Sequence, residues 1–317
     1  MPNPQTFFTV LALGKETSWG SSVARTAFLP IDNPRFQPKA LRNVVDTGLR
    51  GKASQEFDLV AGPGEGTFSY SGNVYADTFG HLIQNTLGSD AVTGTATPFT
   101  HTFTQRPTAA AALSSHSLEW QNGIQSYLIA GARHSGLTLN FNATDGLLTY
   151  QAQGMGKLGT TTASTATTFT TVSAVPGWEA TVSVNAGTPA ALLEGSIQFT
   201  RGMRPVHGLG AAGTQDLADL VPLTIQVGMR LTFEFTGTTE YNYYQSNPIA
   251  KNAIVITWTD PAGKTLKFTS TSAGWRIVDL EANNNIYTAV AQINCLDNAT
   301  DSGVCSMIAT NSQSTAY

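Results

Sequence analysis

Side chains that could perform catalytic or metal chemistry are few and scattered. The five histidines are His81, His101, His116, His134 and His207. None lies at the His-x-x-x-His or His-Glu-x-x-His spacing of a zinc site, and no cysteine lies at a distance that would complete one. We therefore predict structural or solvated histidines and no metal site.

Motifs for nucleotide binding and hydrolysis are equally absent. Residues 154–158 come nearest to a phosphate-binding loop, but the glycine five positions before Gly156 is missing, and Leu158 replaces the Ser or Thr that contacts magnesium. No Gly-x-Ser-x-Gly motif is present. Paired carboxylates of a glycoside hydrolase need no fixed spacing, so a carbohydrate-active enzyme stays open as an alternative. The sequence predicts no catalytic residue and no cofactor.

Two cysteines lie ten residues apart near the C-terminal end, Cys295 and Cys305. Two are too few for a disulfide scaffold, and their spacing does not suit zinc. Two interpretations stay open: free thiols, or a local disulfide that closes a C-terminal loop outside the cell.

The composition excludes several classes of protein. Charged residues make up 12% of the 317 residues, about half of the roughly 25% that is usual in soluble domains. The net charge of -4 leaves no clustered cations for coating nucleic acid. The hydrophobic share of 41% is enough for a folded core. No apolar run is long enough to span a membrane, and no signal peptide is predicted.

The local patterns predict a mainly β protein. Hydrophobic and polar residues alternate in residues 67–70, 138–141, 232–235 and 254–258. The many threonines and 30 glycines suit strands and turns.

Helical spacing occurs in two places. Apolar residues between Tyr75 and Leu87 predict an amphipathic helix over residues 73–88, with Asn73 as N-cap and Gly88 as the end. A shorter helix is expected over 214–220, ended by Pro222. Residues 238–246 contain several aromatics but no clean helical period.

An internal repeat links the two halves of the chain. At an offset of 138 residues Leu118 aligns with Ile256 and Trp120 with Trp258. At an offset of 139, residues 140–149 align with 279–288, and at 165, residues 67–72 align with 232–237. Chance similarity between threonine-rich segments is the alternative, but three blocks keep their order. We therefore predict a duplication.

These features together resemble a known family. The blocks that carry the resemblance are residues 14–20, 28–30, 66–68 with the following helix, 116–120 and the hairpin 136–153. They are similar to the major tail tube proteins of long-tailed, siphovirus-type bacteriophages, in the kind with a duplicated domain.

The resemblance implies a fold of two tandem β-sandwich or rolled-barrel domains, each with a short α-helix. The expected division is a first tail-tube domain over residues 1–158, a threonine-rich linker or ribbon over 159–190, and a second tail-tube domain over 191–317. Such proteins form homotrimeric rings with pseudo-six-fold symmetry, which stack helically into the conduit for DNA ejection. Another β-rich virion component, such as a decoration, baseplate or adhesin-like protein, is the alternative.

The resemblance also implies partners and location. The lumen would hold the tape measure protein and phage DNA without specific binding, and the tube would end on tail terminator and distal tail proteins, with no membrane contact. The protein would be made in the bacterial cytoplasm and reside in the virion tail.

Three acidic residues are candidates for the lumen. Asp145, Asp279 and Glu281 lie at or beside the turns of the repeated hairpin. Solvated turn residues are the alternative interpretation.

Overall fold

The computed structural model describes residues 9–317 except 49, 106–112, 145, 210–214 and 284–285. Strands dominate it, and only two short helices occur among the described residues. The mainly β fold class with short helices is therefore confirmed.

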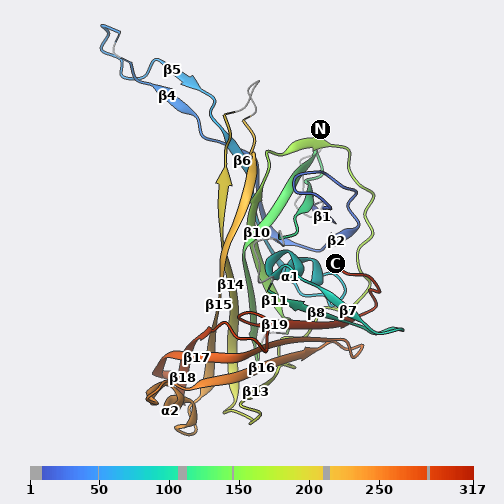
Figure 1. Ribbon diagram of the computed structural model, residues 1–317, viewed down its shortest axis with the longest axis vertical. Helices are drawn as coiled ribbons and strands as arrows, with labels where there is room; N and C mark the ends of the chain where they lie inside the picture. Colours follow the sequence, from blue (N-terminus) through green and yellow to red (C-terminus); the bar gives the residue numbers. More distant parts are fainter. Residues whose placement is uncertain (1–8, 49, 106–112, 145, 210–214, 284–285) are drawn as a thin grey trace.

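One long antiparallel sheet runs through the molecule (Figure 1). Each strand in it pairs with its neighbours in the order β3, β6, β11, β10, β14, β15, β18, β17. The bounds are β3 (Asp32–Leu41), β6 (Gly64–Asn73), β11 (Thr149–Gly156), β10 (Ser126–Asn142), β14 (Leu192–Val206), β15 (Asp219–Glu234), β18 (Ile286–Cys295) and β17 (Thr265–Asn283).

The pairing pattern of this sheet occurs twice. The order β3–β6–β11–β10 recurs as β14–β15–β18–β17, and each fourth strand also pairs with a further strand that precedes it in the chain. Those further strands are β9 (His116–Gln121) and β16 (Lys251–Thr259). Strand pairing thus follows the order of the sequence repeat.

The register corrects the ungapped alignment in two places. Asn140 pairs with Thr149 in the first hairpin, whereas Thr288 of the second pairs with Glu281 and not with Asp279. In the other block, strand pairing places Tyr70 level with Leu231 and not with Phe235. Both slips are by an even number of residues, so every side chain keeps its face.

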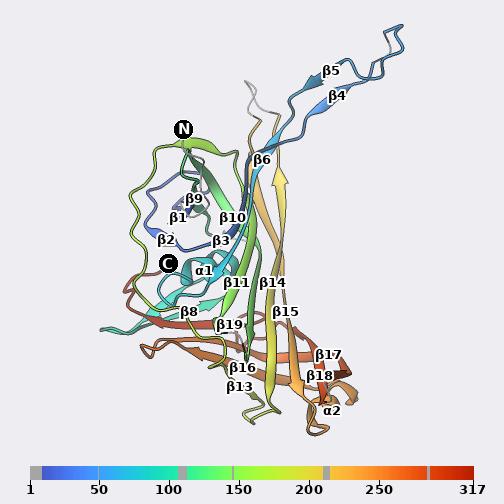
Figure 2. The same ribbon diagram turned by 180° about the vertical axis from the view of Figure 1, so that it is seen from behind.

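A second layer covers one face of the long sheet, as the two opposite views show (Figures 1 and 2). Its first part contains β1 (Val10–Lys15), β2 (Ala27–Leu29), β9, the N-terminal half of β10 and β12 (Thr160–Thr162). Its second part contains β7 (Ala91–Thr93), β8 (Phe99–Thr104), β19 (Ser306–Asn311), β16 and β13 (Thr181–Val184). One continuous hydrophobic core fills the space between the layers.

Contacts cross the expected domain boundaries. β10 pairs with β14, β8 pairs with β19, and the expected linker contributes β12 and β13 to sheets. Phe141 of β10 also packs edge-on against Trp258 of β16, with ring centroids 5.1 Å apart. The division into two domains stays a prediction.

The helices differ in part from expectation. α1 (Gly80–Leu87) ends at Gly88, whose φ of 108° suits glycine, but it begins later than expected: β6 extends to Asn73, and residues 74–79 form a bridge and turns before the helix. The helix expected over 214–220 is wrong: residue 214 is outside the described residues, and Asp219 already begins β15, which contains Pro222. α2 (Thr239–Gln245) forms where no clean period was found.

A two-stranded arm projects from the body at one end (Figures 1 and 2). It consists of β4 (Val44–Asp46) and β5 (Asp58–Val60), and its apolar side chains are exposed, with Val44 and Leu59 each at 61%. An exposed apolar surface of this kind indicates a contact with another molecule.

Candidate assembly surface

The face of the long sheet that the second layer leaves uncovered, here called the open face, is polar. In β11 Tyr150 and Ala152 point into the core, whereas Gln151 and Gln153 are exposed. This alternation follows from the two-residue period of a strand. Because paired residues share a face, the register identifies the open face in every strand.

Neutral polar residues form most of the open face. In the six central strands they are Thr67, Ser69, Ser71 and Asn73; Thr149, Gln151 and Gln153; Thr138, Asn140 and Asn142; Ser196, Gln198 and Thr200; Gln226 and Thr232; and Thr288, Gln292 and Asn294. The buried side is formed mainly by Leu, Ile, Phe, Val, Met, Tyr and Ala at the alternate positions. Hydroxyl and amide groups hydrate well but hold no fixed charge against a phosphate backbone.

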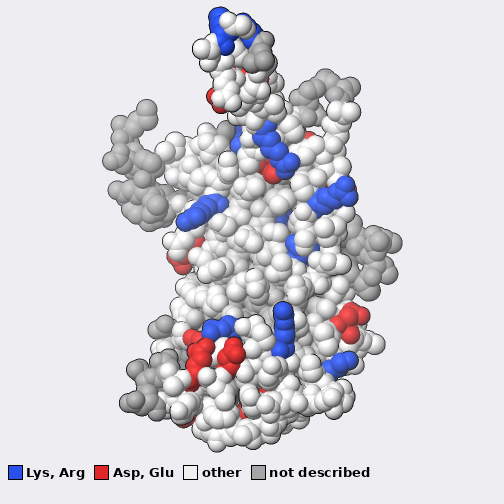
Figure 3. Space-filling model, turned by 90° about the vertical axis from the view of Figure 1, so that its left-hand side faces the viewer, with Lys and Arg blue, Asp and Glu red and all other residues white. Residues whose placement is uncertain are grey.

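Charges are sparse on this face. Figure 3 shows charged groups scattered over a mainly uncharged surface: basic groups lie toward the arm and also in the lower part, and most acidic groups lie toward the lower end. Arg230 of β15 and Glu194 of β14 form an ion pair across the sheet at 3.6 Å, and both side chains are 54% exposed. Such an exposed pair contributes little to stability.

Two of the predicted lumen residues lie on the open face. Asp279 and Glu281 are exposed in β17, opposite Val290 and Thr288, and so lie within a strand and not in a turn. Asp145 lies outside the described residues. The neutral polar residues that form most of the open face were not predicted, although the alternation of Gln, Ser and Thr with apolar residues in the sequence could have identified them.

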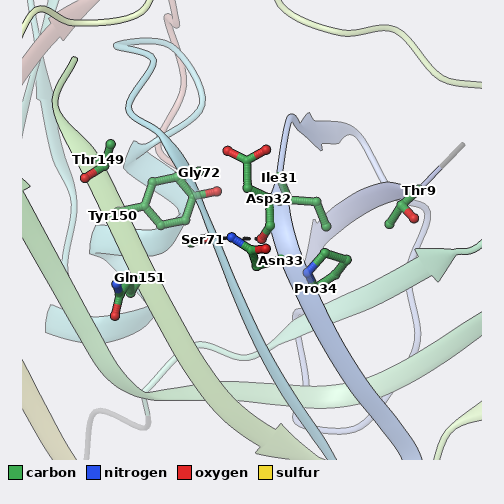
Figure 4. A pocket seen from close by; sticks show the side chains of 10 residues that line it. All are labelled: Thr9, Ile31, Asp32, Asn33, Pro34, Ser71, Gly72, Thr149, Tyr150 and Gln151. Carbon is green, nitrogen blue, oxygen red and sulfur yellow. Dashed lines mark hydrogen bonds between the residues drawn. The ribbon is translucent and has the colours of Figure 1, made fainter. Parts of the chain in front are cut away.

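A hollow of about 650 Å³ opens beside β3 at one end of this face (Figure 4). Asp32 and Asn33 line it from β3, Ser71 from β6, and Tyr150 and Gln151 from β11. The Tyr150 hydroxyl is buried and has no hydrogen-bond partner among the described residues. Burial raises the pKa of Tyr150, so the hydroxyl stays protonated.

A buried polar network holds α1 beneath the covered face. The Asn85 amide lies 2.6 Å from His116 Nδ1, and its oxygen accepts hydrogen bonds from the backbone and ring nitrogens of His134. His134 Nε2 lies 2.7 Å from the Tyr70 hydroxyl. Burial lowers the pKa of His134 to about 3 and that of His116 well below its ordinary value. Both histidines are thus neutral structural groups.

The two cysteines are also buried in the fold. Cys295 and Cys305 are free thiols in the structure, both buried, and burial raises the pKa of each. Among the described residues no cluster of His, Cys, Asp and Glu could hold a metal ion. None of the described helices has the length and apolar character needed to cross a bilayer.

A large sheet with one buried face, one mainly neutral polar face and an exposed apolar arm is typical of a structural class of protein. The comparison with known families identifies it further. A family model described as "Phage tail tube protein" matches residues 9–301, and the chain belongs to this family. It is a structural component of a phage tail. No curated protein sequence matches the chain.

Proposed function

We propose that copies of this chain close their long sheets into rings, that the rings stack into the tail tube of a siphovirus-type phage, and that the open face lines the channel for DNA ejection. The observation that carries the proposal is the open face itself. A channel wall for DNA must be hydrated without binding phosphates, and hydroxyl and amide groups on six adjacent strands meet that need.

The strand count supports a trimer. Each chain supplies eight strands to the long sheet, and adjacent strands lie about 4.8 Å apart. Three copies then give a circumference of about 115 Å and a backbone diameter of about 37 Å before strand tilt widens it. This bore admits a DNA duplex with its hydration, whereas six copies would double it.

The repeated strand pattern supports pseudo-six-fold symmetry and an origin by duplication. Each chain presents two similar four-strand units, so a ring of three chains has six. The pattern gives the two units similar surfaces toward the channel. The tape measure protein and DNA would pass this wall without specific binding, and terminator and distal tail proteins would contact the tube ends.

The arm supplies a contact suited to stacking. Its exposed valines and leucine lie outside the long sheet, so they stay available after a ring has closed. A ring closes by rotation, whereas a stack needs a second contact that does not close. We assign that second contact to the arm.

Electron microscopy of the purified protein tests both contacts. The wild-type chain should form tubes whose end-on views show three-fold order with six similar lobes. Replacing residues 44–60 by a short turn should leave single rings that do not stack. Particles without a central channel would overturn the proposed function, and normal tubes from the shortened chain would remove the arm from stacking.

A further inference from the structure

The seam between the two four-strand units is visible within one chain. β10 and β14 pair from Gly136 opposite Thr200 to Asn142 opposite Glu194. Leu139 and Ile197 face each other across this seam on the covered side, and both are fully buried. On the open side Asn140 faces Ser196.

The two outer edges of the long sheet repeat the two halves of that seam. Tyr150 pairs with Leu139, and 139 residues later Ala289 pairs with Leu280, so β17 corresponds to β10. Gly154 and Ile293, again 139 residues apart, pair with Phe68 and Met229. These pair in turn with Phe36 and Ile197, so β3 corresponds to β14.

Both outer edges lack a strand partner among the described residues. β17 is paired with β16 only as far as Gly274, and beyond it only the β18 side is occupied. β3 pairs with β6, and its other backbone hydrogen bond links Pro38 to Gly159. Leu280 is 45% exposed, although its counterpart Leu139 is fully buried. The partly exposed Phe36 stacks on Trp120, with centroids 4.9 Å apart.

The edges also carry opposite charges on the open face. The counterparts of Asn140 and Ser196 are Glu281 on β17 and Arg35 on β3. Asp279 lies two residues from Glu281 on the same face of β17, so it would be a diagonal neighbour of Arg35 when Glu281 lies opposite Arg35. Opposite charges directly across an antiparallel pair are favourable, and like charges are not.

We infer that residues 277–282 of β17 pair with residues 34–39 of β3 in a second copy of this chain, with Leu280 against Phe36 and Glu281 against Arg35. The inference deepens the proposed ring and rests on it. The pairing buries the apolar side chains that the isolated chain exposes, and it continues the sheet with the register of the internal seam. Pro34 and Pro38 lack N–H donors, so this edge offers few backbone hydrogen bonds to any partner, and side-chain contacts such as Leu280 with Phe36 must select the partner strand.

Crosslinking tests the pairing directly. In the double variant Arg35→Cys/Glu281→Cys a short bis-maleimide should join neighbouring copies and give dimers and trimers. One chain cannot join its own two cysteines, because seven strand spacings separate them, on the order of 34 Å along the sheet. The matched control is Arg35→Cys/Glu194→Cys, whose second cysteine lies on an interior strand, and it should give none of these products. Cys295 and Cys305 are buried in both variants.

Charge exchange tests the same contact without a crosslinker. Arg35→Glu and Glu281→Arg should each cause loss of rings, and the combined variant should restore them. Rings that form normally while the cysteine pair stays uncrosslinked would overturn the pairing and leave the proposed function intact. Crosslinked copies without a channel would support the pairing and overturn the tube. A wild-type chain that forms no rings, together with an Arg35→Cys/Glu281→Cys variant that gives no crosslinks, would overturn both.

Discussion

The two faces of the long sheet come from the same strands yet obey different constraints. Phe199 is 1% exposed and packs edge-on against Phe268, whereas its neighbour Gln198 is exposed on the open face. The covered face is held by shape and burial, which determine stability. The open face contributes little to folding, so its residue types are free to serve the proposed channel.

The largest expected difference between the faces is in stability. Phe199→Ala should lower the free energy of unfolding by about 3–5 kcal/mol, because it leaves a cavity in the core. Gln198→Ala, one residue away, should change it by less than about 0.5 kcal/mol. Urea unfolding followed by tryptophan fluorescence measures both. Equal losses would contradict the assignment of the faces.

Acid should lower the free energy of unfolding through the histidines buried beneath the covered face. The folded protein holds His134 and His116 neutral, because burial lowers their pKa values, that of His134 to about 3. The unfolded chain takes up protons below about pH 6.5, so stability is full above that pH. It falls toward pH 3 by about 1.4 kcal/mol per pH unit for His134, and His116 adds to this loss.

Unfolding free energies of the wild type and His134→Gln across this range check the pH dependence. The variant should be less stable near neutral pH and have a shallower slope. Parallel slopes would show that His134 does not carry the effect.

A lysine on the open face should change stability least and DNA ejection most. Gln198→Lys should leave folding within about 0.5 kcal/mol and tubes intact. In phage, the added cations on the wall should slow DNA ejection at low salt, with recovery at high salt as the phosphate contacts are screened. Gln198→Glu is the matched control. Ejection that is unaffected by the lysine at any salt concentration would place Gln198 outside the channel.

Local patterns predicted the strands but not their long-range partners. Alternation over residues 138–141 and 254–258 marked real strands in β10 and β16, because a half-buried strand needs a two-residue period. A short helical pattern was wrong over 214–220, because Pro222 sits opposite Met203 beside an irregularity in the β14–β15 ladder. Whether these residues form a helix or a strand is decided by pairing with β14, which the local sequence does not specify.

The candidate surface was predicted only in part, because local patterns do not specify which strands pair over long range. Asp279 and Glu281 were identified from the hairpin repeat, and their register became clear only when β15 and β17 were seen on either side of β18. The seam between β10 and β14 joins residues more than fifty positions apart. No local period specifies such a contact.

The internal seam has a kinetic consequence for the proposed ring. Where β10 meets β14, the two partners share one polypeptide, so their encounter does not depend on protein concentration. A trimer of such chains needs two bimolecular encounters before the ring closes, whereas a hexamer of single units needs five. Nucleation of a ring should therefore have a lower reaction order, and assembly should start at lower protein concentrations in the host.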